Sequence, residues 1–111
     1  MDLPPGLMLA AITMRENPLD VLITRNGRDL ETLPAGATVA TGSLRRRAQL
    51  LRYRSDLVIR DIRGNVDTRL KKLHDGFADG LVLAAAALKR LGRSDSIAQY
   101  LNPDICIPAA G

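Results

Sequence analysis

The segment Thr38-Val-Ala-Thr-Gly-Ser-Leu-Arg-Arg-Arg-Ala-Gln-Leu-Leu-Arg52 joins a short apolar strand, a turn of small residues and a helix in direct succession. The strand is predicted over 38–41. After the turn, Leu44, Ala48 and Leu51 take the i, i+4, i+7 spacing of an amphipathic helix. A strand that leads at once into a helix is the repeating unit of α/β folds with parallel strands. This segment therefore predicts an α/β fold.

A second segment repeats the arrangement. An aliphatic strand is predicted from Leu57 to Ile62. A Gly-Asn turn follows it, and Val66, Leu70 and Leu73 then form the apolar stripe of a second helix. Two consecutive units of this kind favour neighbouring parallel strands joined through helices.

Three further stretches of strand length are aliphatic. Strands are predicted from Gly6 to Thr13, from Val21 to Thr24 and from Gly80 to Ala85, with a third helix ending at Gly92 and a short helix from Ser94 to Tyr100. Several of these strands are apolar without alternation, which indicates that helices cover both faces of the sheet. We therefore predict a three-layer α/β sandwich with a largely parallel mixed sheet.

The 111-residue length suits one domain, predicted over residues 1–111, and the 46% hydrophobic content is nearly all aliphatic. No apolar run approaches the roughly 18 residues that span a bilayer, and the N-terminus lacks a signal-peptide pattern. We expect a cytoplasmic protein without a membrane partner. A single cysteine, Cys106, and a single histidine, His74, predict neither an intrachain disulfide nor a Cys/His metal site.

The chain carries a formal charge of +4, and its arginines are concentrated. One window of 25 residues contains eight of them: Arg45, Arg46, Arg47, Arg52, Arg54, Arg60, Arg63 and Arg69. A basic surface favours anionic partners, which include nucleic acid, acidic lipid and polycarboxylate metabolites.

The first turn is a candidate anion site, because the first N–H groups of a helix lack internal acceptors and carry the positive end of its dipole. Guanidinium groups bind planar carboxylates through paired hydrogen bonds. Successive helical residues point about 100° apart, so three adjacent arginines do not all face one ligand. We assign the ligand role to Arg45 and Arg46 and interpret the following arginines as solvated helix-face charges: Arg47, Arg52 and Arg54.

The second turn has the same design. Asn65 is predicted as the helix N-cap, Arg63 lies at the strand end, and Arg69 lies off the apolar stripe of the helix. Ligands of open parallel sheets bind at the carboxyl ends of the strands, so both turns are expected to line one crevice that accepts a polycarboxylate. Two ordinary polar turns are the alternative interpretation.

Other polar residues offer little chemistry. We interpret His74 as a surface residue near a helix end and Cys106 as a buried, unreactive thiol. The sequence shows no convincing catalytic acid, base or nucleophile.

These same residues resemble the porphobilinogen deaminase (hydroxymethylbilane synthase) family. Gly42-Ser-Leu-Arg-Arg46 with Ala48-Gln-Leu50, and Arg63-Gly-Asn-Val66 with Thr68-Arg-Leu70, are similar to its two arginine motifs. Further family counterparts occur in order along the chain: Leu3-Pro-Pro-Gly-Leu7, Arg15-Glu-Asn-Pro18 with Asp20, Leu33-Pro34, Leu83-Ala-Ala85, Leu88-Lys-Arg-Leu-Gly92 and Ile107-Pro-Ala109.

The resemblance implies a transferase that polymerises four porphobilinogen molecules into hydroxymethylbilane, with release of ammonia, in tetrapyrrole and haem biosynthesis. Family members have three domains, the first two similar to periplasmic-binding-protein lobes with the active site between them. A dipyrromethane cofactor is attached to a cysteine of the third domain. The resemblance implies that this chain is the second domain with its flanking edges, that the other domains are its partners, and that it is inactive alone.

By motif matching, one set of residues is expected to bind the acetate and propionate groups of the cofactor and the growing chain: Thr41, Ser43, Arg45, Arg46, Arg63, Gly64, Asn65 and Arg69. Cys106 matches an apolar family position, not the cofactor-bearing cysteine. The resemblance supplies no counterpart of the catalytic aspartate. Gly42 stands where the family commonly has a hydroxyl residue, and Arg47 where it commonly has Gln.

Two other functions compete with this one. A stand-alone anion-binding or carboxylate-binding module has the same predicted fold and needs no link to a deaminase. A nucleic-acid binder would use the arginine window, but the chain lacks aromatic stacking residues and any recognised binding motif. We therefore expect no nucleic-acid partner.

Overall fold

A computed structural model describes residues 19–103 and residue 105 of the chain. The predicted strand over 6–13 and Cys106 lie outside the described residues. The elements follow in the order β1 (Asp20–Thr24), β2 (Thr38–Ala40), α2 (Leu44–Tyr53), β3 (Val58–Arg60), α3 (Val66–His74), β4 (Gly80–Ala84), α4 (Ala85–Arg90), the 3₁₀ turn η1 (Ser94–Ser96) and β5 (Gln99–Leu101).

The five described strands form one mixed sheet in the order β3-β2-β4-β1-β5. β2 lies parallel to β3 and to β4, with Val39 opposite Ile59 on one side and Gly80 on the other. β1 is antiparallel to both of its neighbours, β4 and β5. The predicted mixed α/β sheet is confirmed, but the prediction that it is largely parallel is wrong, because the two pairings of β1 are antiparallel and only the β3-β2-β4 half is parallel.

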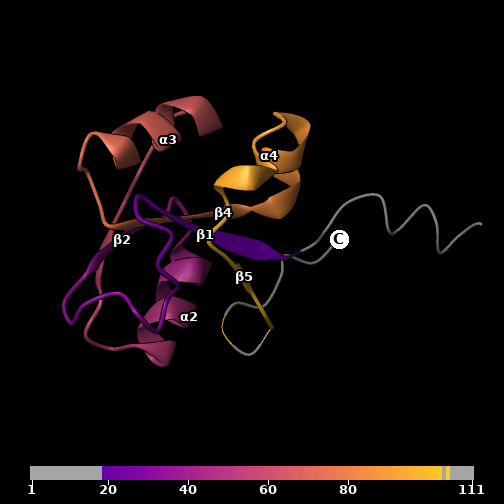
Figure 1. The fold of residues 1–111 in the computed structure, drawn as a ribbon. Coiled ribbons are helices and arrows are strands. Elements are labelled where there is room, and N and C mark those ends of the chain that lie inside the picture. Colours follow the sequence, from indigo (N-terminus) through magenta and orange to yellow (C-terminus); the bar gives the residue numbers. More distant parts are fainter. Residues whose placement is uncertain (1–18, 104, 106–111) are drawn as a thin grey trace, which may run out of the picture.

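Helices lie on both faces of this sheet, with α2 on one side and α3 and α4 on the other (Figure 1). Side chains alternate along β1, so Leu22 packs with Leu50 of α2, whereas Val21 and Ile23 pack with the opposite helices. All three β1 residues are at most 1% exposed. The continuous apolar run of this strand is therefore explained by burial on both faces, and the predicted three-layer arrangement is present.

Polar caps start the two long helices where the sequence predicts them. Ser43 Oγ accepts a hydrogen bond from the N–H of Arg46 at 3.2 Å, and Asn65 Oδ1 accepts one from the N–H of Thr68 at 2.9 Å. Each bond satisfies a donor that the first helical turn leaves without an internal partner. Gly76, at a φ of 94°, follows the end of α3 and donates to the carbonyl of Leu73. The predicted cap at Asn65 is confirmed.

The prediction of a short helix from Ser94 to Tyr100 is wrong. Only the 3₁₀ turn η1 forms there, and the chain then enters β5. In β5, Tyr100 lies opposite Val21, and Leu101 is completely buried in the core beside α2. Pairing with a strand about 80 residues earlier in the chain decides this segment, and local propensity does not report such pairing.

Arg54, at the end of α2, is not the solvated helix-face charge that the sequence suggested. Its side chain is 18% exposed, and Nη1 donates to the carbonyls of Leu30 and Leu33, both at 2.9 Å. Asp56 accepts from Arg54 and also from the N–H of Gly36. These bonds tie the end of α2 to the loop between β1 and β2.

This network predicts an acid-sensitive contribution to stability. The hydrogen bond from Arg54, helped by the Gly36 N–H, lowers the pKa of Asp56 from 3.8 to about 2. The folded state binds a proton at Asp56 less tightly than the unfolded state does. The stability that the ionised Asp56 contributes is therefore complete above pH 3.8 and is lost as the pH falls toward 2. We expect Asp56→Asn to flatten the fall in stability between these pH values, measured as the urea midpoint.

Asp75→Asn, which changes an exposed carboxylate at the end of α3, is the matched control and should keep the wild-type acid slope. Equal slopes for Asp56→Asn and the wild type would contradict the assignment.

None of the described helices is long and apolar enough to cross a membrane. Within the same residues, no three His, Cys, Asp or Glu side chains gather in a group that could hold a metal ion.

Candidate anion-binding site

The polar turns meet at one edge of the sheet, where the parallel strands β2, β3 and β4 end. The N–H of Thr41, directly after β2, donates to the carbonyl of Arg60 at the end of β3 at 3.0 Å. Because β1 is reversed, it begins at this same edge, and its first residue Asp20 lies opposite Ala84, the last residue of β4. This edge is called the arginine edge below, because the side chains of Arg45, Arg46, Arg47, Arg63 and Arg69 reach it from the two turns and helices.

The first turn is shaped by its own hydroxyl groups. Thr41 is 3% exposed, and its Oγ1 accepts from the N–H of Ser43 at 3.2 Å. Ser43 in turn caps α2 through its contact with the N–H of Arg46. Both predicted site residues therefore hold the turn in place, and α2 starts with its N-terminus at the arginine edge.

The second turn depends on a glycine with positive φ. Gly64 has a φ of 107°, and a Cβ there would lie 2.9 Å from Cγ2 of Thr68. The carbonyl of Gly64 accepts from Nε of Arg69 at 2.8 Å, which fixes this arginine against its own turn. Gly64 and Asn65 thus shape the turn from which Arg69 is presented.

The two turns lie in contact with each other. A Cβ built on Gly42 would lie 3.0 Å from the carbonyl oxygen of Ile62 and 3.3 Å and 3.4 Å from Nη1 and Nη2 of Arg69. Residue 42 must therefore be very small if the guanidinium of Arg69 is to occupy this position. The two turns are therefore in direct contact at the arginine edge.

Arg45 and Arg46 both lie near the buried carboxylate of Asp20, for which the sequence predicted no role at this site. Arg46 Nη2 donates to Asp20 Oδ1 at 2.8 Å, and Arg45 Nη2 lies 3.9 Å from Asp20 Oδ2. The Asp20 side chain is 3% exposed, that of Arg46 15% and that of Arg45 38%. Arg46 is therefore engaged inside the protein, whereas Arg45 is the more accessible of the two to a ligand. The 26-residue separation explains why sequence spacing could not show this cluster.

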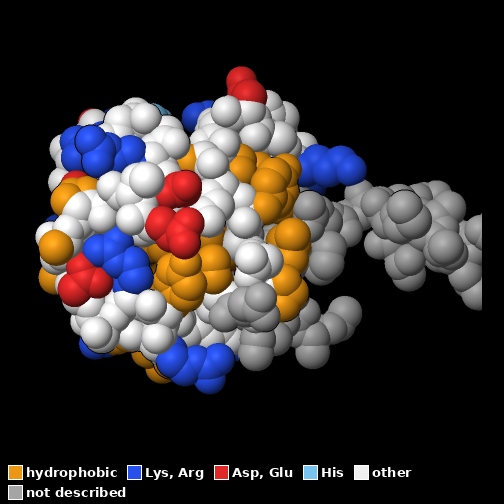
Figure 2. All heavy atoms as spheres, turned by 60° about the horizontal axis from the view of Figure 1, so that its bottom comes forward, with side chains coloured by type: hydrophobic (Ala, Val, Ile, Leu, Met, Phe, Trp, Pro, Cys, Tyr) orange, Lys and Arg blue, Asp and Glu red, His pale blue; other side chains and the backbone are white. Residues whose placement is uncertain are grey.

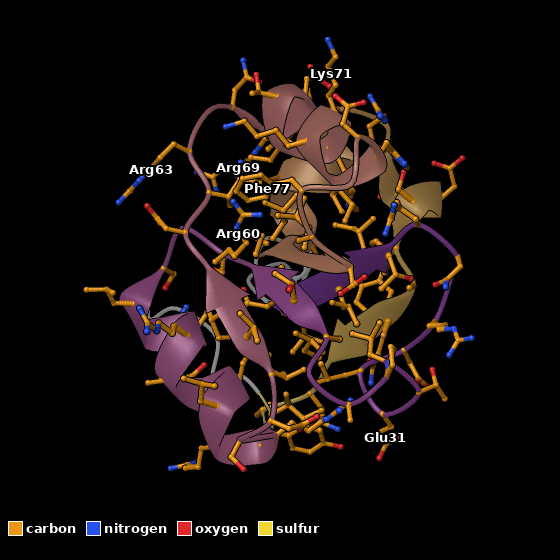
Figure 3. The ribbon with its side chains drawn as sticks, turned by 90° about the vertical axis from the view of Figure 1, so that its left-hand side faces the viewer. Glu31, Arg60, Arg63, Arg69, Lys71 and Phe77 are labelled. Carbon is orange, nitrogen blue, oxygen red and sulfur yellow. The ribbon has the colours of Figure 1, made fainter. Side chains whose placement is uncertain are left out.

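Arg63 projects into solvent from the second turn. Its side chain is 76% exposed, its Nε lies 2.9 Å from Asp61 Oδ2, and it points away from the body of the domain (Figure 3). Because exposed ion pairs contribute only about 0–1 kcal/mol, the pair with Asp61 leaves this guanidinium free to bind another carboxylate.

A pocket of about 220 Å³ lies between the first turn of α2 and the end of β3. Both turns contribute to it, and its walls are Thr41, Gly42, Ser43, Leu44, Arg47, Ile59, Asp61 and Arg63. Arg47, which the sequence suggested to be an ordinary solvated charge, is the α2 arginine that lines this pocket. Helical geometry agrees with this result, because a residue one position beyond Arg46 points about 100° away from it around the helix axis.

Other arginines of the window have structural partners. Arg60 lies over the ring of Phe77 at 3.9 Å from its centroid and donates to the Phe77 carbonyl at 2.9 Å (Figure 3).

On the face shown in Figure 2, basic side chains form separate groups with acidic and hydrophobic side chains between them. The arginine window of the sequence therefore does not form one continuous basic surface on that face.

This fold and this site define an α/β domain with arginine-flanked turns at the carboxyl ends of parallel strands, an arrangement suited to anionic ligands. The family described as "Porphobilinogen deaminase, dipyromethane cofactor binding domain" matches residues 1–111. The chain belongs to this family.

Curated relatives agree with the family match. The chain is 53% identical over 110 residues to a porphobilinogen deaminase of Pelotomaculum thermopropionicum, covering 99% of this chain and 35% of the relative. It is 53% identical over 109 residues to that of Syntrophotalea carbinolica (98% and 35%) and 54% identical over 115 residues to that of Shouchella clausii (99% and 37%). The chain thus spans about a third of the length of these relatives.

The residues at the arginine edge fit the carboxylate groups of a dipyrromethane cofactor. The guanidinium-bearing side chains of Arg45 and Arg63 are 38% and 76% exposed, and the pocket between the turns combines polar and apolar walls. An anion placed here would meet donors that match planar carboxylates.

Proposed function

We propose that this chain supplies the carboxylate-binding part of the active-site cleft of a porphobilinogen deaminase, which polymerises four porphobilinogen molecules into hydroxymethylbilane with release of ammonia. The observation that carries the proposal is the contact between the two arginine turns, where the guanidinium of Arg69 lies against Gly42. This contact gathers cationic groups from two helices at one sheet edge, as a ligand with several carboxylates requires.

The groups at the arginine edge have two kinds of role in this proposal. Arg45 and Arg63 bind acetate or propionate groups directly, because both side chains are more than a third exposed. Arg46 and Arg69 are held by protein acceptors, at 2.8 Å in each case, and supply fixed positive charge behind them. When bound, the dipyrromethane cofactor supplies the primer to which pyrrole units are added.

We infer that the chain alone is inactive. Two carboxylates at the arginine edge are already engaged in ion pairs, Asp20 with Arg46 at 2.8 Å and Asp61 with Arg63 at 2.9 Å. The chain also matches only about a third of its relatives' length. In this proposal residues 1–111 form one domain similar to a periplasmic-binding-protein lobe, work in the cytoplasm, and need the remaining domains of the enzyme as partners.

The test is a calorimetric titration of the chain with a dipyrromethane that bears acetate and propionate groups. Its methyl ester and duplex DNA at the same salt concentration are the controls. We expect saturable binding of the free acid and none of the ester, because the arginines recognise the carboxylates. Equal binding of acid and ester, or tighter binding of DNA, would contradict the proposal.

The same titration separates the proposal from a stand-alone carboxylate-binding module. Such a module would bind a non-pyrrole polycarboxylate, such as tricarballylate, as tightly as the dipyrromethane acid. A clear preference for the pyrrole ligand supports the deaminase assignment.

A further inference from the structure

The pocket between the two turns is too small for a whole pyrrole ligand. Its volume of about 220 Å³ lies below the roughly 300–1,000 Å³ of pockets that enclose complete small molecules. It is large enough for one flexible substituent, since a water molecule occupies about 30 Å³ in the liquid. The pocket therefore suits one arm of a ligand whose body lies outside it.

The walls of the pocket point to a carboxylate on a short aliphatic stem. Arg47 and Arg63 supply two guanidinium groups from different turns, and Asp61 neutralises Arg63 in part. Leu44 and Ile59 supply apolar surface in the same pocket. Leu44 is 82% exposed, which leaves its side chain available to a ligand.

Arg47 has the freedom that such a role needs. Arg45 and Arg46, its neighbours on α2, contact Asp20, whereas the structure shows no hydrogen bond or ion pair of the Arg47 side chain with any described residue. Its backbone is fixed, because its N–H donates to the Ser43 carbonyl at 3.0 Å in the first helical turn. Arg47 is thus an uncommitted guanidinium on a rigid support.

We propose that Arg47 is a specificity-determining residue of this site, and that with Arg63 it clamps one propionate-type arm of the ligand while Leu44 and Ile59 contact the methylene carbons of that arm. This inference rests on the proposed function for the identity of the ligand. It adds a subsite and a residue to that function, because the motif residues assigned above do not include Arg47.

The experiment compares Arg47→Gln with Arg52→Gln, an equal loss of charge at an exposed position on the same helix that does not line the pocket. Both variants of the chain are titrated at constant salt with the dipyrromethane acid and with sodium propionate, and amide resonances of residues 41–44 are followed by NMR. We expect Arg47→Gln to weaken binding about tenfold, as the loss of one charged hydrogen-bonded pair should, and Arg52→Gln by less than about twofold. Arg47→Lys keeps the positive charge but loses the planar guanidinium, so we expect its loss of affinity to lie between those of the two Gln variants.

The outcomes separate this inference from the proposed function. If the wild type binds the dipyrromethane acid and Arg47→Gln weakens it no more than Arg52→Gln, the arm clamp is wrong and the proposed function stands. If propionate shifts the amide resonances of residues 41–44 in the wild type but not in Arg47→Gln, while the dipyrromethane acid does not bind, the clamp stands and the proposed function fails. If neither probe binds, both are wrong.

Discussion

Replacing Asp20 with Ala is expected to lower the free energy of unfolding by about 3 kcal/mol, because it leaves the guanidinium of Arg46 without its carboxylate. Arg46 Nη2 lies 2.8 Å from Asp20 Oδ1, and the two side chains are 15% and 3% exposed. Breaking a buried pair from one side costs more than the pair contributes, since the remaining charge stays poorly solvated. We take the low end of the usual range because Arg46 keeps some access to solvent.

Two polar atoms of this ion pair lack hydrogen-bond partners, which leads to a second expected result. Within the described part of the chain, Asp20 Oδ2 and Arg46 Nε are buried without a hydrogen-bond partner. Exchanging both residues for apolar ones, as in Asp20→Val with Arg46→Met, should therefore recover most of the stability lost in Asp20→Ala. Urea unfolding followed by circular dichroism measures all of these changes.

Asp61→Ala is the matched control, because it removes another aspartate from an arginine pair at the same sheet edge. Asp61 and Arg63 are 59% and 76% exposed, so its cost should stay below about 1 kcal/mol. If Asp20→Ala lowers the free energy of unfolding no more than Asp61→Ala does, burial does not strengthen the Asp20 pair and the interpretation is wrong.

The double replacement Arg45→Ala with Arg63→Ala is expected to weaken binding of the dipyrromethane acid about 100-fold, since each lost charged pair contributes about tenfold. The side chains of these two arginines are 38% and 76% exposed, so both are accessible to a ligand. The fold should survive, because neither side chain is part of the core. Calorimetry measures the affinity, and the circular dichroism spectrum checks the fold.

Net charge alone also affects the binding of an anion, so the control removes two charges elsewhere. Arg52→Ala with Lys71→Ala changes exposed residues of α2 and α3, and Lys71 points away from the arginine edge (Figure 3). Its effect should be less than about threefold at 150 mM salt, where exposed charges are screened beyond about 8 Å. Comparable losses in both double variants would refute the site assignment.

Sequence patterns predicted the parts of the fold that depend on local spacing. The apolar stripe from Val66 to Leu73 predicted α3, and Asn65 predicted its first turn. The strand β5 was missed because its pairing with β1 joins residues about 80 positions apart. Local propensity could not report a partner at that distance, and the short segment 94–100 was therefore assigned to a helix.

The candidate site divides in the same way. The two turns and their arginines are visible as motifs, because small residues and helix starts have local signatures. The engagement of Arg46 by Asp20 and the position of Arg47 in the pocket depend on how α2 is rotated against the sheet. That rotation is set by buried residues such as Leu50, whose contacts come from several elements. The sequence therefore indicated the two turns and their motif arginines, but neither the place of Asp20 and Arg47 at the edge nor which arginines are engaged by protein groups.

The reversed strand β1 also sets the order in which the chain can fold. β1 is made first among the described strands, yet it pairs only with β4, from residue 80 onward, and with β5, from residue 99 onward. During synthesis its apolar stretch Val21–Thr24 stays without a sheet partner until some 60 further residues have been added. Pairings between distant residues slow folding and prolong the exposure of unpaired apolar strands. On the ribosome, β1 is therefore open to aggregation or chaperone capture until β4 has been made.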